Sequence, residues 1–312
     1  MSFKIIGIGE VLWDLLPAGA QLGGAPGNFA FHARALGAHA SVVTRVGADD
    51  YGREILKRFK EQGIADGTVQ LDNVAATGTV AVALSEAGIP NYIIHENVAW
   101  DRLVLTAAAL KAVLNADAIC FGTLAQRSEI SRKTIQSLLT TASKDALLVL
   151  DINLRQNYYS QEVIESSLSL ANVLKLNDTE LGVLAGMFNL TGSTQNQIEQ
   201  LAQKFRLRLI ALTRGPGGSL LFQAGQWSDS PPVLTKVVDT VGAGDAFTAA
   251  MVMGLLQNME LYEINFLAGE VARHVCSCAG ATPPLPKNIC ERFSACKGVV
   301  KKGDGLVAAL KA

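Results

Sequence analysis

The sequence predicts an α/β protein with a doubly wound, mainly parallel β-sheet covered by helices on both faces. Short apolar runs rich in β-branched residues alternate with longer segments of helical periodicity, which is the order that βαβ units require. Two segments without a crossover helix interrupt this alternation. The chain has 312 residues and no repeat or low-complexity tract that would divide it, so we expect one domain over residues 1–312.

The expected strands are short, apolar and rich in β-branched residues: Lys4–Ile8, Ser41–Val46, Ala118–Phe121, Leu147–Asp151, Val173–Leu176 and Leu209–Thr213. The expected helices between them repeat apolar residues every three to four positions: Asn28–Leu36, Gly52–Gln62, Ser131–Ser143, Asn196–Phe205 and Ala246–Gln257. Because such sheets bind ligands at the carboxyl ends of their strands, polar residues that follow strands are the first candidates for a site.

The two interrupting segments predict a second, smaller sheet. Residues 11–22 are punctuated by proline and glycine, and residues 77–100 contain a hairpin pattern in which Gly88 lies in the turn. We expect both to form a flap over the edge of the main sheet. Strand edges there, with apolar residues such as Val80, Val82 and Ile94, favour a homodimer through this flap.

Composition excludes several classes of partner. The formal net charge is -1 and 18% of residues are charged, so nothing electrostatic predicts binding to nucleic acid or to an anionic membrane. No run approaches the ~20 apolar residues of a membrane span, and the N-terminal strand turns polar at Glu10, unlike a signal peptide. The five cysteines are odd in number and scattered, which predicts reduced, mostly buried thiols. We expect a cytoplasmic protein.

The stretch DTVGAGDAF places small residues and then a carboxylate at the start of an expected helix. A helix N-terminus favours anions, and Gly242, Ala243 and Gly244 would let a phosphate approach the backbone closely. A carboxylate there would repel that phosphate, so Asp245 makes chemical sense as the base for a hydroxyl that attacks it. The alternative is an ordinary helix start stabilised by an aspartate.

Two other segments suggest a polyhydroxy ligand. GGAPGN contains Gly24 and Asn28 and leads into an alanine-rich helix, and Asp14 lies among apolar neighbours in GEVLWD. Asn28 and Asp14 are suited to bond hydroxyl groups. The alternatives are a tight turn with Asn28 at the helix N-cap and a simple turn aspartate.

Three strand ends carry further candidates. Asn177 and Glu180, in NDTE, either cap a helix or contribute to a site. The glycine turn TRGPGG either lines a nucleotide or turns the chain. Arg155, in DINLR, either fixes a ligand or forms a surface ion pair. The sequence lacks a Walker P-loop, a dinucleotide fingerprint, HExxH and GxSxG, and its four histidines form no ligand pattern.

These motifs, in this order, resemble the PfkB (ribokinase-like) carbohydrate kinase family over essentially the whole chain. DTVGAGDAF is similar to the C-terminal signature of that family, GGAPGN to its N-terminal signature, NDTE to its N-x-x-E motif, and TRGPGG to its nucleotide-binding turn. The resemblance implies a ribokinase-like fold with a small β-sheet lid, formed by about residues 11–22 and 77–100. It also implies transfer of the γ-phosphoryl group of ATP to a sugar hydroxyl.

The resemblance implies roles for the candidates. Asp245 is the catalytic base, and the N–H groups of Gly242, Ala243 and Gly244 form the anion hole. The residues expected to hold the sugar are Asp14, Gly24, Asn28, Glu96, Arg155 and Asp245. Those expected at the nucleotide are Asn177, Thr213, Gly215 and Gly218. Glu180 would act on Mg²⁺ through water, while Asp239, Val241 and Gly280 would hold a monovalent cation, K⁺.

Within the family, GEVLWDLLP, GTLAQR and DINLR are similar to fructokinase-type members, which predicts D-fructose as the substrate and fructose 6-phosphate as the product. Kinases of 2-keto-3-deoxygluconate share the arginine at the Arg155 position and remain an alternative. Glu96 would disfavour a carboxylated sugar if it faces the site. A non-catalytic sugar- or nucleotide-binding relative is opposed by the intact Asp245, and an oxidoreductase by the failed dinucleotide fingerprint.

Overall fold

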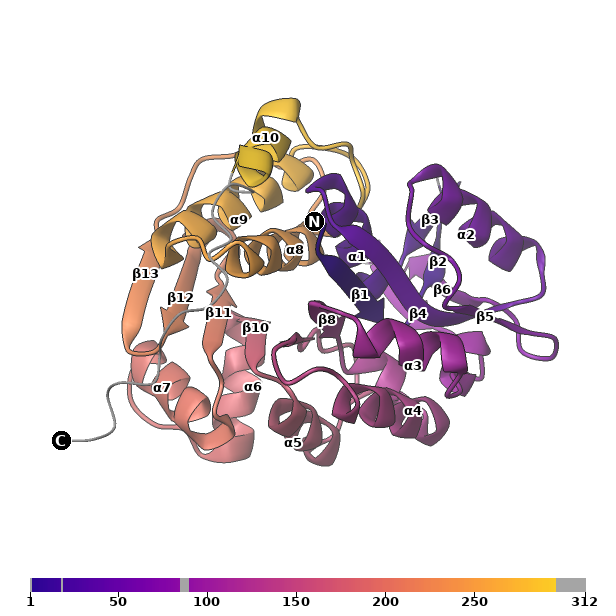
Figure 1. Ribbon diagram of the computed structural model, residues 1–312, viewed down its shortest axis with the longest axis horizontal. Helices are drawn as coiled ribbons and strands as arrows, with labels where there is room; N and C mark the ends of the chain where they lie inside the picture. Colours follow the sequence, from indigo (N-terminus) through magenta and orange to yellow (C-terminus); the bar gives the residue numbers. More distant parts are fainter. Residues whose placement is uncertain (1, 18, 85–89, 296–312) are drawn as a thin grey trace.

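The computed structural model describes residues 2–17, 19–84 and 90–295 and contains two β-sheets (Figure 1). The larger sheet has nine strands in the order β13-β12-β11-β10-β9-β8-β1-β4-β5. Seven of them run parallel: β1 (Lys4–Ile8), β4 (His39–Gly47), β5 (Val69–Asp72), β8 (Ala118–Phe121), β9 (Leu147–Asp151), β10 (Val173–Asn177) and β11 (Leu209–Thr213). The antiparallel strands β12 (Ser219–Gln223) and β13 (Gln226–Ser230) extend one edge. The predicted doubly wound sheet is confirmed.

Helices cover both faces of this sheet, and each face has its own apolar core (Figure 1). One core includes residues of α1 (Ala25–Ala35), α2 (Asp50–Glu61), α8 (Ala243–Leu256), α9 (Leu261–Cys276) and α10 (Lys287–Ala295). The other includes residues of α3 (Ala107–Leu114), α4 (Glu129–Thr140), α5 (Gln161–Leu170), α6 (Asp178–Phe188) and α7 (Thr194–Phe205). Since the central parallel strands pack on both sides, their sequences are almost continuously apolar.

The smaller sheet consists of β2 (Leu12–Leu16), β3 (Gly19–Gly23), β6 (Gly78–Leu84) and β7 (Pro90–Ile94), in the order β3-β2-β6-β7. The two segments expected to stand apart from the main sheet therefore pair with each other. Of the apolar residues noted in this sheet, Val80 and Ile94 are only 5% and 7% exposed, because they pack into the core, and the side chain of Val82 lies outside the described residues.

Three sequence predictions need correction. The helix after GGAPGN begins at Ala25, so Gly24 is the N-cap and Asn28 lies inside the helix. The helix after DTVG begins at Ala243, which puts Asp245 in its first turn. Of the described cysteines, all free, only Cys120 is buried, and Cys296 lies outside the described residues. Among the helices of the described ranges, none is long and apolar enough to span a membrane.

The chain order puts a switch point at β1, whose neighbours β4 and β8 lie on opposite sides of it. Doubly wound sheets bind ligands in the crevice that opens at the carboxyl ends of the strands beside such a point. Glu10 follows β1, Asp151 ends β9 and Asn177 ends β10. These polar residues at strand ends thus share one edge of the sheet.

Candidate active site

The N-terminus of α8 has a backbone that only glycine allows. Gly242 is the N-cap, with φ of 77°, in the left-handed region. A Cβ atom there would lie 2.5 Å from the carbonyl oxygen of Ala281. The N–H groups at the start of a helix lack intrahelical acceptors and attract anions. One of the expected donors is partly engaged, because the N–H of Ala243 donates to the carbonyl of Thr240 over 3.3 Å.

The Asp245 carboxyl lies in this first turn and meets α1. Oδ2 of Asp245 accepts a hydrogen bond of 2.8 Å from Nδ2 of Asn28, which joins two motifs 217 residues apart. Burial, reinforced by the nearby Asp151 carboxylate, raises the pKa of Asp245 to about 7, against the opposing effects of Asn28, Lys175 and Arg155. Part of the Asp245 surface still reaches solvent. A carboxyl group with a pKa near the working pH is suited to take a proton.

A buried ion pair beneath Asp245 was missed by the sequence reasoning. Nζ of Lys175, on β10, lies 3.0 Å from Oδ1 of Asp151, and both side chains are buried. Burial opposes the charge on Lys175, but the carboxylates around it, Asp151 above all, outweigh burial and raise its pKa. Oγ1 of Thr248, on α8, lies 2.9 Å from Oδ2 of Asp151. The signal was a lysine inside an otherwise apolar strand.

Lys175 also reaches the small-residue loop. A Cβ atom on Gly244 would lie 2.9 Å from Nζ of Lys175, so the ammonium group stands directly against the Gly244 backbone. This places a permanent positive charge at the N-terminus of α8, next to its partial positive charge. The arrangement favours an anion at this position.

Three acidic groups and one arginine surround the sugar-side motifs. Burial raises the pKa of Asp14, on β2, and raises that of Glu10 to about 7. The positive charge of Arg155 opposes the shift at Asp14, Glu10 and Asp245 alike, so Arg155 lies within electrostatic range of all three. Arg155 itself is exposed.

Glu10 is a second residue that the motif analysis did not include as a candidate. Its side chain is 3% exposed, and no described residue supplies a hydrogen-bond partner to its Oε2. Gly24, with φ of 106°, passes close to it: a Cβ atom on Gly24 would lie 2.5 Å from the Glu10 carbonyl oxygen. The signal was a charged residue at the end of an apolar first strand.

The nucleotide-side candidates lie around the ends of β10 and β11. Asn177 and Glu180 form the expected capping box of α6, in which Oδ1 of Asn177 accepts from the Glu180 N–H over 2.9 Å. The two Glu180 oxygens accept from the N–H groups of Asn177 (2.8 Å) and Leu154 (3.0 Å). Thr213 ends β11, and Gly215 and Gly218 form the turn into β12.

The residues expected at a monovalent cation are drawn together by one carboxylate. Oδ1 of Asp239 accepts from the N–H of Val241 over 3.0 Å, and Oδ2 accepts from the N–H of Gly280 over 3.1 Å. Asp239 therefore links the segment before α8 to the loop after α9. No cluster of three or more His, Cys, Asp or Glu side chains suited to a metal occurs in the described ranges, so a cation here would rely on backbone carbonyls.

Glu96 does not point to a sugar preference. It is exposed, and its Oε1 accepts a hydrogen bond of 2.8 Å from the Tyr158 hydroxyl. The inference that it disfavours carboxylated sugars therefore loses its basis.

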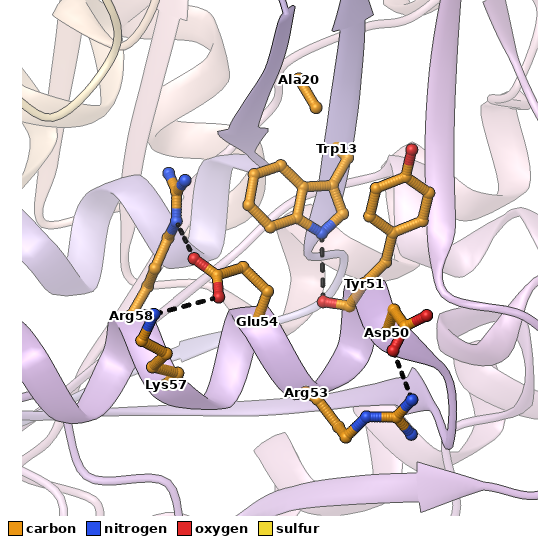
Figure 2. A pocket seen from close by; sticks show the side chains of 8 residues that line it. All are labelled: Trp13, Ala20, Asp50, Tyr51, Arg53, Glu54, Lys57 and Arg58. Atoms are coloured by element: carbon orange, nitrogen blue, oxygen red, sulfur yellow. Dashed lines mark hydrogen bonds and ion pairs between the residues drawn. The ribbon is translucent and has the colours of Figure 1, made fainter.

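A cleft of about 540 Å³ lies elsewhere, between α2 and the smaller sheet (Figure 2). Trp13 lines it, and because Asp14 is the next residue along β2, Asp14 points to the opposite face of the sheet. The charges around it pair with each other, Arg53 with Asp50, and Lys57 and Arg58 with Glu54. The cleft therefore lies on the face of the smaller sheet opposite Asp14, apart from the candidate site.

The fold and the site define a ribokinase-like α/β protein, and comparisons with known proteins agree. A family model described as pfkB family carbohydrate kinase matches residues 19–288. A fructokinase from Klebsiella pneumoniae is 29% identical over 266 residues, which cover 82% of this chain and 85% of that protein. The chain belongs to the pfkB family of carbohydrate kinases, and it is a phosphotransferase that acts on a sugar.

Solved structures show the same fold. An uncharacterized sugar kinase from Pyrococcus horikoshii, solved in complex with ATP, has a TM-score of 0.73 at 26% identity, covering 89% of this chain and 94% of that one. A fructokinase from Vibrio cholerae O395, solved with fructose, ADP and calcium, has a TM-score of 0.78 at 22% identity, covering 94% and 99%.

Proposed function

We propose that this sugar kinase is a fructokinase, which transfers the γ-phosphoryl group of ATP to D-fructose and yields fructose 6-phosphate. The observation that carries the chemistry is the Asp245 carboxyl, held by Asn28 at the N-terminus of α8 with its pKa raised to about 7. Similarity to fructokinases from Klebsiella pneumoniae and Oryza sativa, at 29% and 27% identity, supports the choice of sugar.

Asp245 acts in this proposal as the general base. Its carboxylate accepts the proton of the sugar hydroxyl while the hydroxyl oxygen attacks the γ-phosphorus and the bond to ADP breaks. The N–H groups of Gly242, Ala243 and Gly244, with the Lys175 ammonium behind Gly244, stabilise the charge on the transferring phosphoryl group. The half-buried position of Asp245 keeps it reachable by a hydroxyl while limiting water.

The sugar lies between α1 and the smaller sheet, which we propose to act as the lid. Asp14 and Asn28 bond its hydroxyl groups, and the Gly24 backbone lets the ring approach. Arg155 adds a positive charge beside three acidic groups, which would also suit 2-keto-3-deoxygluconate, the alternative substrate. Glu96 would bind the sugar only if its hydrogen bond from the Tyr158 hydroxyl were replaced by one from the sugar.

ATP lies along Thr213, Gly215 and Gly218, and the ATP-bound relative supports this donor. Both Glu180 oxygens already accept backbone N–H groups, so Glu180 fits Mg²⁺ through water rather than by direct ligation, with Asn177 beside it. Mg²⁺ supplies charge neutralisation at the phosphates. Asp239 and the carbonyls of Val241 and Gly280 fit K⁺, which prefers neutral oxygens to a carboxylate cluster.

The test is a coupled ADP-release assay with Mg-ATP and potassium against fructose, ribose, glucose, 2-keto-3-deoxygluconate and adenosine. We expect turnover with fructose and a loss of several orders of magnitude in kcat for Asp245→Asn, with ATP binding retained. Asp145→Asn, an exposed site, is the matched control. Near-normal turnover of Asp245→Asn would refute the base assignment, and turnover of another sugar alone would refute fructose.

A companion proposal concerns assembly. A homodimer through the edges β3 and β7 of the smaller sheet predicts a concentration-dependent dimer, and sedimentation that shows only monomer at high concentration excludes it.

A further inference from the structure

His32 is a fully buried histidine on α1 that contacts the opposite end of the chain. Its side chain is 0% exposed, and its Nε2 lies 2.9 Å from the carbonyl oxygen of Ala281, 249 residues away. It follows Asn28 by four positions, so both side chains lie on one face of α1. That face meets α8 through the bond from Asn28 to Asp245.

The ring can make this contact in only one way. Burial lowers the pKa of His32 to about 4, so the ring is neutral at physiological pH and carries one N–H group. A carbonyl oxygen only accepts, so this N–H must lie on Nε2. Nδ1 is then a bare acceptor, and no described residue bonds to it. A buried polar atom without a partner is costly, which an apolar side chain in the same place would avoid.

The carbonyl that His32 holds is pressed against the start of α8. A Cβ atom on Gly242 would lie 2.5 Å from the Ala281 oxygen and 2.7 Å from its Cα, so the two backbones touch. On the other side, Asp239 accepts the N–H of Gly280. The segment Gly280–Ala281 is therefore held by a hydrogen bond at each of its two residues, and it packs against Gly242.

We infer that His32 is a positioning residue: by holding the Ala281 carbonyl, it fixes the Gly242 backbone and so aims the N–H groups at the N-terminus of α8. The inference rests on the proposed function, which gives those N–H groups the transferring phosphoryl. One face of α1 then supports two parts of the proposed site: Asn28 bonds the Asp245 carboxyl, and His32 supports the N–H groups proposed to bind the phosphoryl group.

The test compares His32→Leu, which removes the donor, with His32→Gln, which keeps an N–H near the position of Nε2. His274→Leu is the matched control, because Nε2 of His274 lies 3.0 Å from the carbonyl of Pro284 in the same loop, three residues further on. We expect His32→Leu to lower kcat by about 10–100-fold, the cost of a misaligned reacting group, with the KM for sugar nearly unchanged. His32→Gln should recover most of that loss.

Hydrogen exchange supplies a readout that needs no turnover. In His32→Leu, amides in peptides covering residues 239–245 should exchange faster than in the wild type, and in His274→Leu they should not. Equal kcat losses in His32→Leu and His274→Leu, or in His32→Leu and His32→Gln, would overturn the inference. If the wild type phosphorylates no sugar, the proposed function fails, and unchanged exchange at residues 239–245 still decides against His32 separately.

Discussion

Replacing Lys175 with methionine tests the buried charge cluster beneath the site. Lys175 pairs with Asp151, and its charge also lowers the proton affinity of Glu180 and Asp245. Removing one partner of a buried pair costs about 3–5 kcal/mol, because the other charge is left uncompensated. With an unfolding entropy of about 2.1 cal/mol/K per residue over 312 residues, this corresponds to a drop in Tm of about 5–8 °C.

The loss should depend on pH in a definite direction. Without Lys175, the carboxyls around it bind protons more tightly in the folded state than in the unfolded state. A raised folded-state proton affinity contributes stability at low pH that is lost as pH rises. The difference in Tm between Lys175→Met and the wild type should therefore be larger near pH 8 than near pH 5.5, as measured by calorimetry at both values.

Two variants make the measurement specific. Lys133→Met removes an exposed pair with Glu129, where the lysine side chain is 74% exposed, and should change Tm by no more than about 1 °C. The double variant Asp151→Asn, Lys175→Met removes both buried charges and should recover most of the lost stability. A Tm loss in Lys175→Met that matches Lys133→Met, or that is the same at both pH values, would refute the reasoning.

Three further predictions concern the reaction. Because Asp245 must be unprotonated to act as a base and its pKa is about 7, kcat/KM of the wild type should rise with pH through that value and then level off; a flat profile from pH 5.5 to 8 contradicts this. In Asn28→Leu, the lost hydrogen bond no longer lowers the pKa of Asp245, so the rise in the same profile should move to higher pH, and an unmoved profile would show that the bond is unimportant. Gly242→Ala should lose at least about tenfold in kcat because its Cβ meets Ala281, whereas Gly225→Ala, with φ of 83° but open space around it, should keep full turnover; equal effects of the two would remove the steric explanation.

The sequence alone predicted the fold class and marked the loop at Asp245 as a candidate site, because both depend on local residue types. Apolar, β-branched runs specify buried parallel strands wherever they occur. Gly242 and Gly24 adopt backbone conformations that other residues avoid. Because only glycine adopts them easily, the residue type alone marked both positions in the sequence. The capping box of Asn177 and Glu180 is likewise a contact over three residues.

Helix boundaries were less accurate. The starts of α1 and α8 were each expected three residues late, because Gly24 and Gly242 act as N-caps without a side-chain hydrogen bond, and a cap of this kind leaves no polar residue to detect. The β12–β13 hairpin was also missed, since its strands are short and β13 is only partly buried.

Only the tertiary structure decided which polar groups meet. The pair of Lys175 and Asp151 forms because β9 and β10 are neighbours in the sheet. The contact of His32 with Ala281 forms because α1 packs beside α8 and Ala281 lies against Gly242, the N-cap of α8. The same packing buries Glu10 and leaves Glu96 exposed. Burial and charge proximity set the pKa of Asp245, and both are sums over atoms distant in sequence. A local pattern can therefore mark Asp245 as a candidate base, whereas its proton affinity is a property of the folded protein.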